Sequence, residues 1–567
     1  MLMKKILLFA SAALLFASCA KENITPSETP DNNSQKGDIT LSFSASQTGF
    51  GTKAVIGETT TDTEGAKSTA INWQESDKIS VFDGVGDNCE FDTKDFSTET
   101  TTSCTFEGNV TKLATDYTAV YPYTEGATIS ETGVISGVTL PAIQTAVAGS
   151  FDPKAALMAA ETVEGGRDLE FKNLVGYVKV ATDFDCKKIE LCAASGEKLA
   201  GEGTISFNEG GTPSFTLGEG AESTITLRPE DEGTTIAAGT YYIAVPATTL
   251  AAGWSIRLTD IDDIVSTKKG SKDITFKQST ILNLGPISKI EPRYLTFSAE
   301  SEQTFTMNFQ PNPNYDAFTL GEGEYFEYRV GNGEWKKFTE TRSGVTFGGA
   351  GNDLQLRGIS SKGTADSNEC GWTTISFENA TYVRCSGDIR TLVNYKDYEN
   401  ANTSKARFCN LFNYCLQLRS APDLPATELA SYCYSNMFQS CGSLQTAPEE
   451  LLPSTTLAEG CYSCMFQDCE SLTTAPKLPA KTLAEDCYRS MFIGCSSLTT
   501  APDLPAMTLA KYCYSGMFYN CTSLKTVELP ATTLAEDCYS AMFSCCSKLQ
   551  NVYIKGDTCK LPWHNVT

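Results

Sequence analysis

The chain has 567 residues, too many for one hydrophobic core, so roughly three or four domains are expected. Its formal net charge is −25 at pH 7. This charge argues against nucleic acid or an anionic lipid surface as the main partner, because both would repel the chain.

The first residues have the layout of an export signal. Two lysines precede an apolar run over residues 6–17, which is followed by Ser18 and Cys19. The run is shorter than the ~20 residues of a membrane span, but it suits the hydrophobic region of a signal peptide. Residues 16–19, Phe-Ala-Ser-Cys, resemble the lipobox of bacterial lipoproteins, which implies removal of residues 1–18 and acylation of the Cys19 thiol. The alternative is an ordinary secretory signal in which the cysteine is incidental.

Residues 19–37 are rich in Ser, Thr, Pro, Asn and Asp and contain almost nothing to bury, which predicts a flexible tether. The lipoprotein resemblance implies several acyl chains, palmitate among them, and multiple acylation gives stable attachment to a membrane. We therefore expect a lipid-anchored protein of the bacterial outer membrane that faces the cell exterior. The sequence leaves the choice between the inner and outer leaflet open.

Residues 38–400 carry strand signals, since short runs such as 39–43 and 177–182 alternate apolar and polar side chains between Gly and Asp turns. Six segments resemble, in order, the landmarks of the fimbrillin family: 71–73, 77–82, Tyr121-Pro122, 140–144, 169–174 and 241–246. The resemblance implies two tandem all-β sandwiches of transthyretin-like type, at residues 38–150 and 151–288. Each segment taken alone is also compatible with a strand that buries an aromatic side chain.

The fimbrillin resemblance also makes fimbrial subunits possible partners. It implies that a shaft subunit polymerises by strand exchange after a protease trims its N-terminal strand. No single arginine marks such a cleavage site in the tether, and a large C-terminal domain would obstruct a growing polymer. An accessory or tip role therefore fits better than a shaft role.

Residues 289–400 predict a further small β-domain, with strands at residues 294–297, 326–330, 354–358 and 374–377. This domain directly precedes a repetitive region, and solenoids need their terminal apolar face covered. We expect it to cap the open end of the repeats.

Residues 401–556 consist of repeats, and residues 557–567 form a short C-terminal tail. A Cys-Tyr pair recurs in steps of 28, 26, 26 and 25 residues, at Cys433, Cys461, Cys487, Cys513 and Cys538. A nearly fixed period of this length is typical of a solenoid, in which stacked units bury a stripe that one unit cannot bury alone.

Each repeat predicts an α-helix followed by a short strand. Four apolar residues recur every four positions and would form one stripe on a helix: Leu483, Cys487, Met491 and Cys495. Residues 482–485, Thr-Leu-Ala-Glu, have the form of a capping box, and two other repeats contain the same four residues. Residues 498–505 contain two prolines, which limit the strand to a few residues.

The core of the repeat, Met-Phe-x-x-Cys-x-x-Leu, resembles the BspA-like leucine-rich repeats of bacterial surface proteins. It occurs at residues 437–444, 465–472, 491–498, 517–524 and 542–549. The resemblance implies a right-handed solenoid that binds proteins or host surfaces. The fold expected for the whole chain is therefore multidomain: tandem all-β sandwiches, a further β-domain and a C-terminal leucine-rich-repeat α/β solenoid.

Most cysteines of the repeats are interpreted as buried small hydrophobic residues rather than as disulfides, while the state of Cys545, Cys546 and Cys559 near the C-terminus is left open. On a helix, Cys487 and Cys495 would lie about 12 Å apart, which is beyond the reach of a disulfide. Cys461 and Cys464 form a Cys-x-x-Cys motif, but no second pair or histidine completes a metal site.

No constellation for catalysis stands out. The single histidine, His564, lies near the C-terminus, which removes the commonest general base and most zinc sites. Asp260, Asp262 and Asp263 lack further ligands at calcium-loop spacing and fit a turn between strands better. An enzyme that uses carboxylates alone is an alternative, although no paired-acid site is evident. We expect no enzymatic activity, no cofactor and no metal.

Within the repeats, framework positions recur while others change. The changing positions are Gln439, Gln467, Ile493 and Tyr519 after the phenylalanine, and Glu449, Lys477, Asp503 and Glu528 in the strand segment. On a solenoid such positions lie on the exposed face, where a protein or glycan partner could be recognised. We therefore expect a cell-surface lipoprotein of adhesion type, with a fimbrial accessory or tip subunit as the alternative. Ordinary solvated surface is the simpler interpretation of the same positions.

Overall fold

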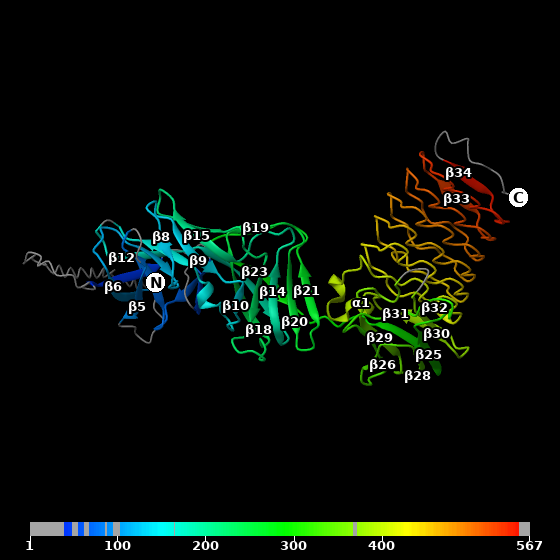
Figure 1. The fold of residues 1–567 in the computed structure, drawn as a ribbon, viewed down its shortest axis with the longest axis horizontal. Helices are drawn as coiled ribbons and strands as arrows, with labels where there is room; N and C mark the ends of the chain where they lie inside the picture. The colour runs from blue at the N-terminus through cyan, green and yellow to red at the C-terminus, as the bar shows by residue number, and fades with distance from the viewer. Residues whose placement is uncertain are drawn as a thin grey trace, which may run out of the picture.

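The structure is a computed structural model, and it describes residues 39–47, 55–61, 67–84, 88–94, 103–163, 165–366 and 371–554. The signal peptide, Cys19, the tether and the C-terminal tail lie outside the described residues. The described chain is elongated, with three β-rich units in series and a stack of repeats at the C-terminal end (Figure 1). Within this part of the chain, no helix has the length and hydropathy that a membrane crossing requires.

The first unit is a closed barrel of seven strands. They are β1 (Ile39–Gln47), β4 (Lys78–Phe82), β5 (Asn88–Lys94), β6 (Cys104–Val110), β7 (Thr118–Tyr121), β11 (Met158–Glu161) and β12 (Asp168–Asn173). Strand β1 closes the barrel, because it pairs antiparallel with β6 and parallel with β12. The expected sandwich of two separate sheets is therefore wrong here, since one sheet runs round the whole unit and takes in strands beyond residue 150. A separate hairpin is formed by β2 (Val55–Thr61) and β3 (Lys67–Asn72).

The core of the barrel is centred on Trp73, which is 1% exposed. Its ring makes edge contacts with Phe106, Tyr121 and Phe171, at centroid distances of 5.2, 5.3 and 5.5 Å. The Tyr121 hydroxyl donates to the Asp77 carboxylate at 2.8 Å, and burial raises the pKa of Asp77. Four of the landmark segments thus contribute side chains to one core, where these side chains pack together.

A four-stranded sheet in the order β16-β15-β9-β8 packs beside the barrel, and its buried residues belong to the barrel core. Its strands are β8 (Thr128–Ile129), β9 (Ile135–Leu140), β15 (Gly201–Phe207) and β16 (Pro213–Leu217). Because β8 and β9 precede the last barrel strands while β15 and β16 follow them, this sheet links the first unit to the second.

The second unit is a two-layer sandwich whose sheets share one core. Its five-stranded sheet contains β10 (Ile143–Thr145), β17 (Thr224–Arg228), β14 (Cys186–Cys192), β20 (Ser255–Asp260) and β21 (Val265–Lys269). The facing sheet contains β18 (Gly239–Pro246), β13 (Val175–Thr182) and β23 (Ile281–Ile287), and β19 (Thr248–Leu250) pairs with β22 (Ile274–Phe276). A short 3₁₀ helix, η1 (Pro153–Ala155), precedes β11. As predicted, Asp262 and Asp263 belong to the turn between β20 and β21, and the carboxylate of Asp260, the last residue of β20, accepts hydrogen bonds from the Asp262 and Ile264 N–H groups.

The third unit is a second two-layer arrangement. One sheet has β27 (Lys336–Phe338), β26 (Tyr325–Val330), β29 (Leu354–Ile359), β24 (Leu295–Ala299), β31 (Val383–Ser386) and β32 (Leu418–Ser420). The other has β28 (Arg342–Phe347), β25 (Gln303–Asn308) and β30 (Thr374–Phe377). The short helices α1 (Thr391–Asn394) and η2 (Tyr395–Asn400) follow. The four strands predicted here from the sequence are confirmed as β24, β26, β29 and β30.

The repeats contain no α-helix among the described residues, so the predicted α/β solenoid is wrong. Their only strands are β32, β33 (Thr526–Leu529) and β34 (Asn551–Ile554), and the segments predicted as helices consist of consecutive turns. The supposed capping boxes do not cap helices, since Thr482 forms a parallel bridge with Thr456 of the preceding unit, and Thr533 one with Thr508. We call residues 406–554 the repeat stack.

A left-handed residue at every fourth position explains why the helix does not form. Each unit has three such residues, with φ between +48° and +68°: Tyr432, Asn436 and Ser440, then Gly460, Cys464 and Asp468, then Asp486, Ser490 and Gly494, then Tyr512, Gly516 and Asn520, then Asp537, Ala541 and Cys545. An α-helix cannot contain left-handed residues. The period of four is therefore real, but it is the period of a turn and not of a helix with 3.6 residues per turn.

Backbone hydrogen bonds alternate between neighbouring units and the unit's own turns. Tyr434, Asn436 and Phe438 donate their N–H groups to carbonyls of the next unit, each at 2.9 Å. The residues between them, such as Ser435 and Met437, donate to the carbonyl three positions earlier in their own turn. This alternation satisfies the buried backbone groups without a helix or a long sheet.

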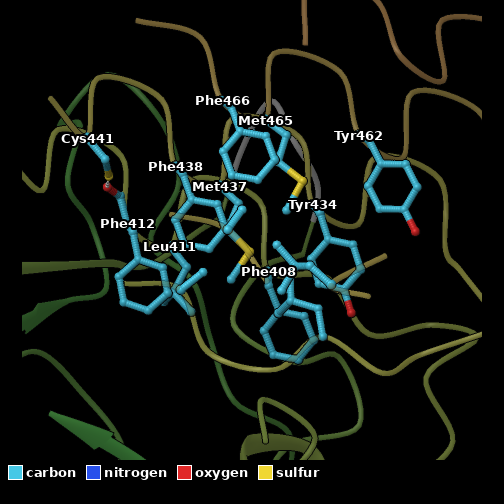
Figure 2. Packing of buried hydrophobic residues seen from close by; sticks show 14 of the residues in the cluster. Phe408, Leu411, Phe412, Tyr434, Met437, Phe438, Cys441, Tyr462, Met465 and Phe466 are labelled. Carbon is cyan, nitrogen blue, oxygen red and sulfur yellow. Dashed lines mark hydrogen bonds between the residues drawn. The ribbon is translucent and has the colours of Figure 1, made fainter. Parts of the chain in front are cut away.

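The interior of the stack contains columns of stacked aromatic side chains, one from each unit (Figure 2). Successive phenylalanine rings lie 5.4–6.3 Å apart with interplanar angles of 4–14°, at Phe412, Phe438, Phe466, Phe492, Phe518 and Phe543. A parallel column runs through Phe408, Tyr434, Tyr462, Tyr488, Tyr514 and Tyr539 at 5.7–6.0 Å. The stack thus buries the stripe that a single unit would leave exposed.

The cysteines of the stack are free thiols, as predicted for most of them, and most are buried. One column has a specific contact that the sequence did not reveal: each thiol lies 3.0–3.1 Å from a phenylalanine carbonyl of the preceding unit and donates to it. The donors are Cys441, Cys469, Cys495, Cys521 and Cys546. Cysteine is small enough for the core and still supplies a weak donor there.

The third unit and the repeat stack share one continuous hydrophobic core. Strand β31 pairs in parallel with β32, and isolated parallel bridges then join Ser420 to Thr446 and Thr446 to Thr474. The Phe297 ring of β24 contacts Phe412, the first ring of the phenylalanine column, at 6.2 Å. The six-stranded sheet of the third unit therefore continues along the stack as a series of parallel bridges between units, which we call the ladder.

Candidate partner-binding surface

The predicted binding residues after the phenylalanines form one column on the repeat stack. The carbonyls of Gln467, Ile493 and Tyr519 each accept a hydrogen bond from an N–H group of the preceding unit, which fixes the spacing of the column. Gln439, Gln467 and Ile493 are half-buried, whereas Tyr519 is 39% exposed. Tyr519 is therefore the member of this column most available to a partner.

The second predicted column consists of exposed side chains, but two of its members neutralise each other. The Lys477 ammonium lies 2.8 Å from a Glu449 carboxylate oxygen and 2.7 Å from one of Glu450. The Lys477 N–H also donates to the Glu449 carbonyl at 2.8 Å. Exposed ion pairs of this kind add little to stability, and here they leave little free charge for a partner.

The same column continues into a surface groove with a volume of about 460 Å³, which we call the ladder groove. Asp503, Glu528 and Tyr553 line it from three successive units. Strands β33 and β34 pair in parallel with Glu528 opposite Tyr553, and Tyr553 is 57% exposed. The groove thus brings two of the predicted residues together with a third that was not predicted.

Prolines explain why the groove lies at this place. Pro502, Pro505 and Pro530 line it and have no N–H to donate, so the backbone ladder is interrupted between the units. Neither Asp503 nor Glu528 forms an ion pair within the part of the chain that the structure describes. The two carboxylates therefore keep their negative charge available to a ligand.

The ladder groove presents carboxylate groups that accept hydrogen bonds. Its carboxylates can accept hydrogen bonds from lysine, arginine or sugar hydroxyl groups, and charge-assisted bonds of this kind are the stronger ones. The exposed Tyr553 ring offers an amphipathic contact face, as aromatic residues at interfaces commonly do. An anionic ligand would be repelled from this groove.

Tyr553 could have been found from the sequence. Val552 precedes it as Val527 precedes Glu528, and the two valines are 25 residues apart, the last step of the repeat. The last Met-Phe-x-x-Cys-x-x-Leu core ends at residue 549, so the core motif alone does not include the strand segment that follows it.

Within the described residues, no group of three or more His, Cys, Asp or Glu side chains is placed to hold a metal ion. Burial raises the pKa of Cys409 and Cys415 to about 12, so these thiols stay protonated and poorly reactive near neutral pH. The expected absence of enzymatic activity stays a prediction.

No family model matches the chain, and no curated protein sequence matches it. Several solved structures do resemble the chain. A protein of Bacteroides uniformis, provisionally assigned to cell adhesion, is 16% identical over 44% of this chain and 94% of that chain, with a TM-score of 0.27. A second such protein, from Bacteroides ovatus, is 14% identical over 45% of this chain and 97% of that chain, with a TM-score of 0.26.

A tip fimbrial protein of Porphyromonas gingivalis, truncated at its C-terminus, also resembles the chain. It is 12% identical over 45% of this chain and 96% of that chain, with a TM-score of 0.21. Adhesion and fimbrial proteins form the class that the fimbrillin resemblance implies. TM-scores this low carry no argument for this chain, so its function is argued from its own residues.

Proposed function

We propose that the chain is a cell-surface binding protein of adhesion type that recognises a protein or glycan partner through the outer columns of its repeat stack. The ladder groove is the observation that carries this proposal. The interior columns repeat the same residue types, whereas the residues that change between units lie on the surface, and three of them line one groove. A constant interior with a changing exterior is the design of repeat proteins that bind partners.

The charge of the groove favours a partner that presents cationic or hydroxyl groups. Asp503 and Glu528 lie on adjacent units and are exposed, and neither is neutralised by a described lysine or arginine. The chain as a whole carries −25, so long-range attraction also favours a basic partner surface. A lysine-bearing segment of a protein therefore matches the groove, as does a hydroxyl-rich sugar.

Removal of the two groove carboxylates tests the proposed surface. In Asp503→Asn/Glu528→Gln we expect binding of the mature protein to weaken about tenfold, because charge-assisted hydrogen bonds are lost while the shape of the groove is kept. The measurement is surface binding of wild type and variant to immobilised mucin, to matrix proteins and to a glycan array.

The matched control is Glu449→Gln/Glu450→Gln, which removes the same two negative charges at a place where both carboxylates are already paired with Lys477. This control should bind like the wild type. An equal loss in both variants would show that net charge alone matters. A wild-type protein that binds none of these surfaces would count against the adhesion role.

The proposed location rests on the sequence, since Cys19 lies outside the described residues. We propose that the acylated Cys19 anchors the chain in the outer membrane with the β-rich units and repeats outside the cell. Protease added to intact cells should then digest the wild-type protein, while Cys19→Ala should be released or mislocalised. Protection until lysis would place the protein in the periplasm. Co-purification with a fimbrial polymer would instead assign it to fimbriae as an accessory or tip subunit.

A further inference from the structure

A second cavity lies at the junction between the third unit and the repeat stack, and we call it the junction cleft. Its volume is about 710 Å³, and its lining includes Tyr382, Arg384, Arg419, Glu300, Asp353 and Ser301. Arg384 belongs to β31 and Arg419 to β32, which pair in parallel. Their neighbours Val383 and Leu418 point into the core, so both arginines lie on the outer face of the same sheet.

The two arginines are exceptions among the basic residues of this region. Arg293, Arg357 and Arg390 each form an ion pair with a carboxylate. Arg384 and Arg419 form no ion pair with any described residue, and the buried Nε of Arg419 has no hydrogen-bond partner. In a chain with a net charge of −25, two neighbouring guanidinium groups that form no ion pair with a described residue are unexpected.

Tyr382 gives the cleft an aromatic surface. Its side chain is 48% exposed, and the Arg419 guanidinium lies 3.6 Å from its ring centroid. This contact places the guanidinium over one face of the ring and holds it there. A flat, partly apolar ligand can therefore pack on the ring while its acidic group reaches the arginines.

The remaining polar groups select among anionic ligands. Glu300 and Asp353 line the cleft without pairing to the arginines, so they are free to accept hydrogen bonds. The Ser301 and Thr381 hydroxyls are 2.8 Å apart at its edge. A simple anion would gain nothing from the carboxylates and would be repelled by them. A ligand that carries an acid group and several hydroxyl groups would use both sets.

We propose that the junction cleft binds an acidic sugar. Its carboxylate or sulfate is held by Arg384 and Arg419, its ring packs on Tyr382, and its hydroxyl groups donate to Glu300 and Asp353. Guanidinium groups suit this role because their fixed donors match the geometry of carboxylate and sulfate oxygens. This site is distinct from the ladder groove, whose carboxylates repel the same ligand, and it does not depend on the function proposed for that groove.

The ladder that starts at Arg419 gives a longer acidic glycan a surface to follow. The Gln445 N–H donates to the Arg419 carbonyl at 3.4 Å, and the Thr473 N–H donates to the Gln445 carbonyl at 3.3 Å. Two units further along, the Lys525 N–H donates to the Thr499 carbonyl at 3.4 Å. All four side chains are exposed, and none is acidic. A polysaccharide with regularly spaced acidic groups would therefore meet no acidic side chain at these four positions.

The test is calorimetric titration of the mature protein with tetrasaccharides of hyaluronan and chondroitin sulfate. We expect both to bind, and Arg384→Gln/Arg419→Gln to weaken the binding about tenfold or more, since two charged contacts are lost. Tyr382→Ala should weaken it by a smaller factor. Arg228→Gln, an exposed arginine of the second unit, removes a positive charge elsewhere and should have no effect.

Three outcomes would overturn the proposal. The first is failure of both tetrasaccharides to bind the wild-type protein. The second is equally tight binding of inorganic sulfate, which would reduce the cleft to an anion site. The third is tighter binding of a glutamate-rich peptide, which would assign it to acidic proteins. The single variant Arg384→Gln is expected to fold like the wild type, because this side chain is exposed and forms no ion pair with a described residue. A loss of sugar binding in this variant can therefore be assigned to the lost contact and not to misfolding. Asp503→Asn/Glu528→Gln should keep full sugar binding, which separates this site from the ladder groove.

Discussion

Phe492→Ala is expected to lower the stability of the repeat stack by about 3–5 kcal/mol, the usual effect of removing a buried phenylalanine ring. The side chain is fully buried at the middle of its column. Its ring lies 5.7 Å from Phe466 and 5.8 Å from Phe518, both nearly parallel to it. The substitution therefore removes two ring contacts and leaves a cavity that flanking units, tied by backbone bonds, cannot close. Amide hydrogen exchange in residues 487–498 measures the loss locally, as suits a chain of several units.

Ile493→Ala is the control for that substitution. Ile493 is the next residue but is half-buried, so its truncation should lower stability by no more than about 1 kcal/mol. If both variants exchanged equally fast, the columns would not be the source of the stack's stability.

Asn520→Val is expected to destabilise the stack by about 1–3 kcal/mol, whereas Asn520→Gly should leave it nearly unchanged. Asn520 is exposed and has φ +58°, so its effect comes from the backbone and not from packing. Asparagine and glycine tolerate the left-handed region, but a β-branched side chain does not. Local hydrogen exchange around residues 513–524 compares the three proteins.

Comparison of Asn520→Gly with Asn520→Ala also distinguishes the turn from the helix. If the segment were an α-helix, Asn520→Gly would weaken it by up to about 1 kcal/mol and Asn520→Ala would strengthen it. In the turn, Asn520→Ala should weaken it instead. An Asn520→Ala variant that is more stable than the wild type would therefore contradict the left-handed geometry.

Strands with one buried face could be predicted from the sequence because their signal is local. In β24, the buried Leu295, Phe297 and Ala299 alternate with the half-buried Thr296 and Ser298. Barrel closure could not be predicted in this way. It depends on β1 meeting β12, whose paired residues Ser44 and Asp168 are far apart in sequence.

The helix error has a different cause. Side chains spaced by four residues suit both an α-helix and a four-residue turn over a short span, so the pattern of apolar residues does not decide between them. The deciding signal lies at the intervening positions, where Asn436, Ser440, Asp468 and Gly494 supply residues that tolerate positive φ. Reading the polar positions with the apolar ones would have predicted the turn.

The candidate sites were predictable only where they follow the repeat. Asp503 and Glu528 share one position of the unit, and their exposure followed from that position. Arg384 and Arg419 belong to different parts of the chain and meet only because β31 pairs with β32. No local sequence pattern predicts such a pairing, so the junction cleft could be identified only from the structure.

The hydrogen bonds between units run along the axis of the repeat stack, and this has a mechanical consequence. A pull between an anchored N-terminus and a partner held at Glu528 or Tyr553 would be transmitted through successive sets of bonds, each set carrying the full tension. The least stable pair of units would then open first, and the chain would lengthen one unit at a time. A ligand held in the junction cleft would be tethered upstream of nearly all of these bonds, so the same pull would leave the stack unloaded. The two sites would thus differ in mechanical compliance. A partner held at the ladder groove would be connected through units that can open under load, whereas a ligand in the junction cleft would be connected through a shorter and stiffer part of the chain.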